Sequence, residues 1–225
     1  MNRKAQSEII GFILVAFIVI VLVLGAYVWG DRVLGERRDE YSAVRMKTKM
    51  LELRDAIVSV SQDGPNSTRV VSINIDSGKL YLDNSFIPVS CGQERRDNGL
   101  IYEIETKTEV VDTTTWALND PFENETGDLC TVGGVGVSYP GILFAKSASV
   151  GETGKYLTQY LVSFRNLKDM DTGEHHIIKL GSSTIEQNTT GIGEGTHNLM
   201  IRNDGSSYDS TNSRWTHDIA LIFDP

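Results

Sequence analysis

The stretch Ile9–Gly30, IIGFILVAFIVIVLVLGAYVWG, contains no charged side chain in 22 residues. As a helix it would be about 33 Å long, close to the roughly 30 Å of a bilayer's hydrocarbon core. In lipid, a single segment satisfies its own backbone N–H and C=O groups only as a helix. Arg3 and Lys4 precede the run, so the N-terminus is expected to stay in the cytoplasm. The run therefore predicts a membrane-spanning helix.

Three interpretations of this helix compete. A secretory signal peptide has an apolar core of about 7–15 residues and small residues before its cleavage site. This core is longer, and no Ala-x-Ala occurs near Gly30. A simple membrane anchor needs only length and apolarity. The third interpretation depends on the residues before the run, Arg3-Lys4-Ala5-Gln6-Ser7-Glu8.

A short basic leader, a small residue, a polar stub and then an apolar helix resemble the N-terminus of archaeal type IV pilin-like proteins. The resemblance covers roughly residues 3–30. It implies a class III-type leader, residues 1–5, that prepilin peptidase removes between Ala5 and Gln6. It also implies assembly into a homo-oligomeric helical filament by the pilus assembly machinery. The assembly residues would then be Glu8, Ile9, Phe12, Leu14, Phe17, Leu22 and Leu24.

Glu8 has a physical role of its own, because an acid at the start of a helix complements the positive end of the helix dipole. The resemblance implies that this carboxylate meets the free amine of a neighbouring subunit. The alternative is that Glu8 lies among the cytoplasmic headgroups.

A charged neck, Asp31–Asp39, follows the apolar run, and the helical pattern then continues. Apolar residues recur at spacings of three and four, which is typical of one helix face. They are Ala43, Met46, Met50, Leu53, Ile57 and Val60. Gly64 and Pro65 supply stop signals, so one helix is expected over residues 6–62. This apolar face packs either against the chain's own β domain or against helices of neighbouring subunits.

Residues 66–225 form short runs rich in β-branched and aromatic residues, separated by Gly, Asn, Ser and Asp. A hairpin is expected around Asp76-Ser77-Gly78, and Asn203-Asp204-Gly205 is expected to open the last turn. The predicted class is α+β, a long N-terminal helix followed by an antiparallel β-sandwich-like domain. The strands are expected at 69–75, 79–82, 100–111, 142–150, 156–165, 175–180, 197–202 and 215–223.

The charge distribution separates the same two parts. The chain has 21 basic and 30 acidic residues, and its net charge is -9. Residues 1–61 hold nine basic and seven acidic side chains, and the rest hold 12 and 23, giving +2 and -11. An acidic chain lacks the basic face that a nucleic-acid partner requires. The mean hydropathy of -0.18 excludes a multi-span membrane protein.

Two further features fit a domain outside the cell. Cys91 and Cys130 are the two cysteines of the chain, and a lone pair in an extracellular domain is most simply a disulfide. Two buried free thiols are the alternative. Asn-x-Ser/Thr sequons at Asn66, Asn124 and Asn188 are candidate glycosylation sites in predicted loops.

The search for catalytic chemistry finds no convincing motif. His175 and His176 are adjacent, so on a strand they point to opposite faces. His197 and His217 could approach each other across a terminal hairpin, but a third metal ligand is missing. The acidic stretch 119–128 lacks the spacing of an EF-hand and is expected to be a solvated loop. We therefore expect no catalytic residue, cofactor or metal.

Three functions follow in order of preference. The first is a structural subunit of an archaeal type IV pilus-like filament, serving adhesion or surface attachment. The alternative is a membrane-anchored extracellular protein that does not polymerise, either a minor pilin or an archaellum stator-like component. The third is an anchored enzyme or solute-binding domain. The expected location is a membrane-inserted precursor with a cytoplasmic N-terminus, and a mature protein on the archaeal cell surface.

Overall fold

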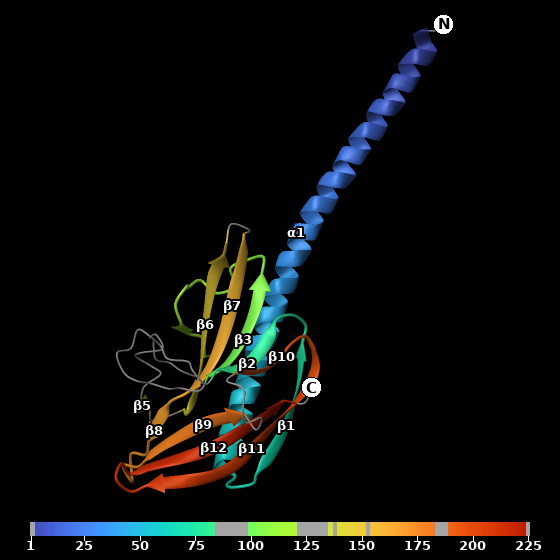
Figure 1. Cartoon of the computed structure of the whole chain (residues 1–225). Coiled ribbons are helices and arrows are strands. Elements are labelled where there is room, and N and C mark those ends of the chain that lie inside the picture. The colour runs from blue at the N-terminus through green and yellow to red at the C-terminus, as the bar shows by residue number, and fades with distance from the viewer. Residues whose placement is uncertain are drawn as a thin grey trace.

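The computed structural model describes residues 3–83, 99–120, 135–136, 139–151, 154–182 and 189–223. One helix, α1 (Arg3–Gln62), extends far beyond the β-rich part of the chain (Figure 1). It ends at Gln62, as expected. Gly64 follows with a φ of +91°, a conformation that suits glycine at a helix end. The long helix and the β-rich domain after it are therefore confirmed.

The strands form two sheets. In the first the order is β1 (Thr68–Ile75), β11 (Gly195–Asp209), β12 (Arg214–Phe223), β9 (His175–Ser182), β8 (Asn166–Lys168) and β5 (Val135–Gly136). In the second it is β10 (Thr189–Ile192), β2 (Lys79–Asp83), β3 (Gly99–Thr106), β7 (Lys155–Phe164), β6 (Gly141–Val150) and β4 (Ala117–Leu118).

Most neighbouring strands run antiparallel, as expected. Within the described residues, two pairs are parallel: β12 with β9, and β5 with β8. The β domain is thus mostly antiparallel.

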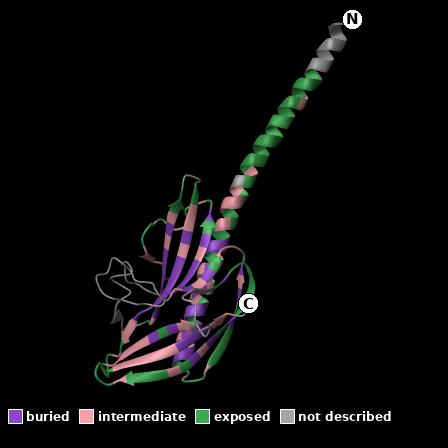
Figure 2. Ribbon diagram, viewed as in Figure 1, coloured by how far each residue is buried: buried purple, intermediate pink, exposed green. Residues whose placement is uncertain are grey.

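The C-terminal half of α1 lies against both sheets, and its apolar face belongs to the same core as the inward side chains of the strands (Figure 2). The six residues of the predicted stripe are all buried: Ala43, Met46, Met50, Leu53, Ile57 and Val60. Their first interpretation, packing against the chain's own β domain, is confirmed.

The predicted hairpin around Asp76-Ser77-Gly78 is wrong. β1 pairs with β11, whereas β2 pairs with β3 and β10, so the turn carries the chain from one sheet to the other. Gly78 lies so close to β3 that a Cβ atom would sit 2.2 Å from the Glu103 carbonyl oxygen. The buried Tyr102 hydroxyl of β3 donates a hydrogen bond to the Ser77 carbonyl. These contacts fix the turn against β3 and prevent β1 and β2 from pairing.

The turn predicted at Asn203-Asp204-Gly205 is also wrong. β11 continues through it to Asp209, with a register shift between Asn203 and Gly205 where it pairs with β12. Gly205 has a φ of +152°, and its N–H donates to the Asn203 side-chain oxygen over 2.9 Å. The three residues therefore form a β-bulge rather than a turn.

The bulge also caps the helix. The last carbonyl groups of a helix have no intrahelical partner. The Val60 carbonyl accepts hydrogen bonds from the Ser67 hydroxyl (2.8 Å) and from the side-chain amide of the fully buried Asn203 (3.3 Å). The end of α1 is therefore held by β11, far away in the sequence.

Candidate assembly helix and its seat

The N-terminal half of α1 makes no buried contact with the β domain in the described part of the chain. From Gly11 onward the helix is long and apolar enough to cross a membrane, and none of its most apolar stretch is buried (Figure 2). The predicted assembly residues in this half are all exposed: Phe12, Leu14, Phe17, Leu22 and Leu24. This half is apolar all round, so it requires lipid or other helices around it.

The residues of the predicted cleavage site lie in the first turns of α1. The helix begins at Arg3, three residues before the expected mature terminus at Gln6. For Ala5, Gln6, Glu8 and Ile9 the structure describes the helical backbone alone. Cleavage between Ala5 and Gln6, and the role of Glu8 in assembly, stay predictions.

Where α1 enters the β domain, the charged neck is fixed by polar contacts. The Lys107 backbone N–H donates to the Asp39 carboxylate over 2.6 Å. One turn and a half later, the Arg45 guanidinium lies 2.8 Å from the Asp76 carboxylate. The Lys107 side chain also passes close to Gly35, where a Cβ would sit 3.1 Å from its ammonium nitrogen. These contacts set the angle at which the helix leaves the domain.

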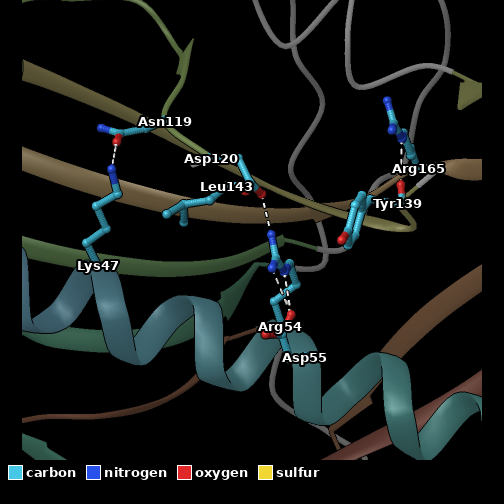
Figure 3. Close-up of polar contacts among 8 residues, drawn as sticks. All are labelled: Lys47, Arg54, Asp55, Asn119, Asp120, Tyr139, Leu143 and Arg165. Carbon is cyan, nitrogen blue, oxygen red and sulfur yellow. Dashed lines mark hydrogen bonds and ion pairs between the residues drawn. The ribbon is translucent and has the colours of Figure 1, made fainter. Parts of the chain in front are cut away.

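Deeper in the domain, α1 carries a buried ion pair that we call the Arg54 clamp. It comprises Arg54, Asp55, Asp120, the Leu143 N–H and the Tyr139 ring (Figure 3). The side chains of Arg54 and Asp120 are each only 2% exposed, and their charged groups are in direct contact. The Arg54 Nε–H also donates to the Asp55 carboxylate over 2.8 Å.

Other groups complete the clamp. Asp120 accepts the Leu143 N–H over 3.3 Å, and the Arg54 guanidinium carbon lies 5.7 Å from the centre of the Tyr139 ring. Burial disfavours the charge of Arg54, but its hydrogen bonds to Asp55 and Asp120 outweigh burial, so the pKa of Arg54 is raised. The guanidinium therefore stays charged inside the domain.

A glycine makes room for the clamp. A Cβ atom at Gly141 would lie 2.7 Å from the Arg54 Cγ and 2.9 Å from the Phe164 Cε1. About two turns before Arg54 on α1, the Lys47 ammonium donates to the Asn119 side-chain oxygen (Figure 3). Burial lowers the pKa of Lys47, and Asp120 partly opposes this shift. Asn119 and Asp120, the first two residues of the stretch 119–128 that was expected to be a solvated loop, thus face the helix, and residues 121–128 lie outside the described residues.

The histidines are arranged differently from the prediction. His197 lies on β11 opposite β1, away from His217, whose ring nitrogen Nε2 is 3.5 Å from Nδ1 of His176. The other nitrogen of His217 lies 2.8 Å from the Ser206 hydroxyl. Burial, and then the neighbouring His176, lower the pKa of His217, while Asp218 raises it.

The histidine pair supplies two of the side chains that a metal site would need, and the expectation of no metal stays a prediction. Among the described residues, no group of three or more His, Cys, Asp and Glu side chains is arranged to hold a metal ion. The expectations of no enzyme activity and no cofactor stay predictions.

Of the modification sites, Asn66 alone lies within the described residues. It is exposed in the turn between α1 and β1, with a φ of +67°, and its N–H donates to the Asn203 carbonyl over 2.8 Å. Its side chain is thus accessible to a glycosyltransferase. The predicted sites at Cys91, Cys130, Asn124 and Asn188 lie outside the described residues.

The sequence analysis did not identify Arg54 or Asp120. The sequence holds one indication of Arg54. It follows Leu53 directly at the edge of the apolar stripe, and a charged group that is buried there needs a partner.

Comparison of the chain with protein-family models, with curated proteins and with solved structures finds no match.

Proposed function

We propose that this chain is a structural subunit of an archaeal type IV pilus-like surface filament that serves adhesion or surface attachment. One observation carries the proposal: a single helix has an N-terminal half that is exposed and apolar all round and a C-terminal half that is built into a β domain. In this proposal the β domain is an extracellular, sandwich-like head that covers the outside of the filament.

The physical argument concerns the exposed half of α1. Large side chains such as Phe12, Phe17 and Leu22 are exposed in the isolated chain, and their transfer out of water is strongly favourable. Lipid covers them in the precursor. Once the assembly machinery has extracted the helix, similar helices of neighbouring copies take the place of lipid and form the core of the filament.

The non-polymerising alternative makes the same use of lipid but needs neither cleavage nor assembly. A simple anchor tolerates any apolar sequence, whereas a prepilin requires a small residue at its cut. The two functions therefore differ in the N-terminus of the mature protein and in the place where the protein accumulates.

The first experiment reads the mature N-terminus by sequencing the intact protein from membranes and surface fractions. The expected terminus is Gln6. The variant Ala5→Asp should leave full-length chains in the membrane, whereas the matched variant Ala5→Gly keeps a small residue and should still be cleaved. A mature protein that begins at Met1 or Asn2 contradicts the prepilin assignment.

The second experiment examines filaments directly. Sheared surface fractions should contain the protein in fibres visible by electron microscopy, and Ala5→Asp should abolish them. If the processed protein is found only in membranes, the non-polymerising alternative is correct.

A further inference from the structure

The inner face of the first sheet continues past the end of α1. Ile219 of β12 belongs to the core that α1 covers. Because side chains alternate along a strand, His217 and Trp215 point to the same face as Ile219. Gln62, the last residue of α1, lines the same pocket as His217. Beyond the helix end, the face that buries the core therefore becomes partly accessible, and its residues there carry rings.

Four rings lie together on this part of the face, and we call them the ring strip: His176, His217, Trp215 and Tyr208. Trp215 pairs with His176 on β9 and with Tyr208 on β11, so the side chains share one face. The ring centres of Trp215 and Tyr208 are 4.9 Å apart, and those of the two histidines 5.8 Å. Tyr208 is 44% exposed, and the other three are half-buried. Three strands make the strip roughly 10 Å wide.

The ring strip borders a pocket at the end of α1. The pocket has a volume of about 440 Å³, within the range of roughly 300–1,000 Å³ that is typical of sites for small ligands. Pro140 and Leu167 supply apolar wall, and His176 and His217 supply ring nitrogens. Apolar walls with a few polar groups are the usual composition of a ligand site.

Two polar turns lie beside the ring strip, the turn after β8 and the turn after β11. The His175 N–H donates to the Ser213 carbonyl over 2.8 Å, which joins the two turns. The Trp215 indole N–H donates to the Glu174 carboxylate over 3.1 Å, which fixes the indole. The turns carry carboxylate, hydroxyl and amide groups: Asp169, Thr172, Glu174, Thr211 and Asn212. The rings are therefore bordered by groups that form hydrogen bonds.

The charges beside the ring strip favour an uncharged ligand. The Asp169 carboxylate accepts the Thr172 hydroxyl over 2.8 Å, and Glu174 accepts the Trp215 indole N–H, so both acids already have partners within the chain. Their negative charge nevertheless opposes an anion. Burial and the neighbouring histidine lower the pKa of His217, so this imidazole is neutral at pH 7.

We propose that the ring strip and its pocket bind an uncharged segment of a saccharide chain. The C–H groups on one face of a pyranose ring carry partial positive charge, which suits the negative face of an aromatic ring. The sugar hydroxyls both donate and accept hydrogen bonds, as the groups of the two turns require.

The place of the site fits contact with an outside ligand. The turn between β11 and β12 lies at the end of the β domain that is remote from the N-terminus of α1 (Figure 1). Binding there needs neither leader cleavage nor assembly. The inference therefore goes beyond the proposed function, and it applies equally to a filament subunit and to a membrane-anchored protein.

The test titrates the full chain with neutral saccharides by isothermal titration calorimetry. The chain is held in micelles of a zwitterionic detergent, which contains no sugar, and the probes are cellohexaose, maltohexaose, mannohexaose and chitohexaose. At least one should bind saturably. Tyr208→Ala should weaken that binding about tenfold, because it removes one stacking ring. The matched control Tyr41→Ala removes a tyrosine that is 67% exposed on α1, and it should leave the affinity unchanged.

A second pair of variants separates ring stacking from stability. Trp215→Phe keeps an aromatic ring and should retain binding, whereas Trp215→Ala should abolish it. Urea unfolding curves should show that the variants fold. Equal losses of affinity for Tyr208→Ala and Tyr41→Ala would overturn the assignment of the ring strip.

The remaining outcomes concern the class of ligand. The inference is wrong if none of the four saccharides binds, or if the acidic hexagalacturonate binds more tightly than they do. Decaproline tests a proline-rich peptide, because extended proline helices also dock on aromatic surfaces. Binding of decaproline but of no saccharide would assign the face to a peptide instead.

These outcomes are distinct from those of the filament experiments. Filaments of a chain that binds none of the saccharides would overturn the saccharide site alone. Saccharide binding by a chain that forms no filaments would support the site while overturning the filament function.

Discussion

The Arg54 clamp makes the sharpest prediction about stability. Asp120→Asn removes one charge of a pair whose side chains are each 2% exposed, and it keeps the size of the side chain. Removal of one partner of a buried ion pair costs about 3–5 kcal/mol. Asp55, 2.8 Å from Arg54, continues to pair with the guanidinium, so we expect a loss at the lower end, about 3 kcal/mol.

The measurement is urea unfolding of the full chain in detergent micelles, followed by tryptophan fluorescence, in a double-mutant cycle. Arg54→Met combined with Asp120→Asn should cost much less than the sum of the two single variants, because neither charge is then buried alone. Arg45→Met is the control on the same helix. Its pair with Asp76 is partly exposed, so the loss should be about 0–1 kcal/mol. A loss below about 1 kcal/mol for Asp120→Asn, or additive losses in the cycle, would refute the reasoning.

Three further predictions concern packing and pH. Gly141→Ala should lower the free energy of unfolding by about 2 kcal/mol, because its methyl group has no room beside the clamp; Gly181→Ala, at an open position, should change it by less than about 0.5 kcal/mol. Leu53→Ala, fully buried, should cost about 2–5 kcal/mol, whereas Leu34→Ala, exposed, should be nearly neutral in thermal unfolding of the monomer. Because the pKa of His217 is lowered from 6.5, the unfolded chain binds a proton that the folded chain does not, so stability should fall as the pH drops through 6.5. Unfolding curves at several pH values check this, and a His217→Gln variant that keeps the full pH dependence would contradict it.

The sequence predicted the elements better than their pairing. The stripe from Ala43 to Val60 identified the buried face of α1 because helix periodicity is local. Strand alternation was equally local, so β6, β7 and β12 lie close to their expected positions. Pairing depends on contacts between distant segments, and the same Asp-Ser-Gly turn serves a hairpin or a change of sheet. Here the approach of Gly78 to β3 decides between them.

The buried ion pair that holds α1 in the β domain was missed for a related reason. Arg54 and Asp120 are 66 residues apart, and nothing in the sequence near Asp120 shows that its carboxylate is buried. Most of the residues from 119 to 128 are polar, so an exposed loop was the natural interpretation. The exposed half of α1 was predictable in full because its length and lack of charge depend on no tertiary contact.

The cap that β11 places on the end of α1 has a mechanical consequence. The Asn203 amide and the Ser67 hydroxyl hold the Val60 carbonyl, and the Arg54 clamp holds the helix roughly 9 Å away along its axis. A pull on the head, directed along the helix, loads both attachments and the buried apolar face at once, in shear. They cannot be peeled apart one after another. The β domain and α1 therefore bear tension as one body, and a tensile load passes into α1 before the β domain detaches.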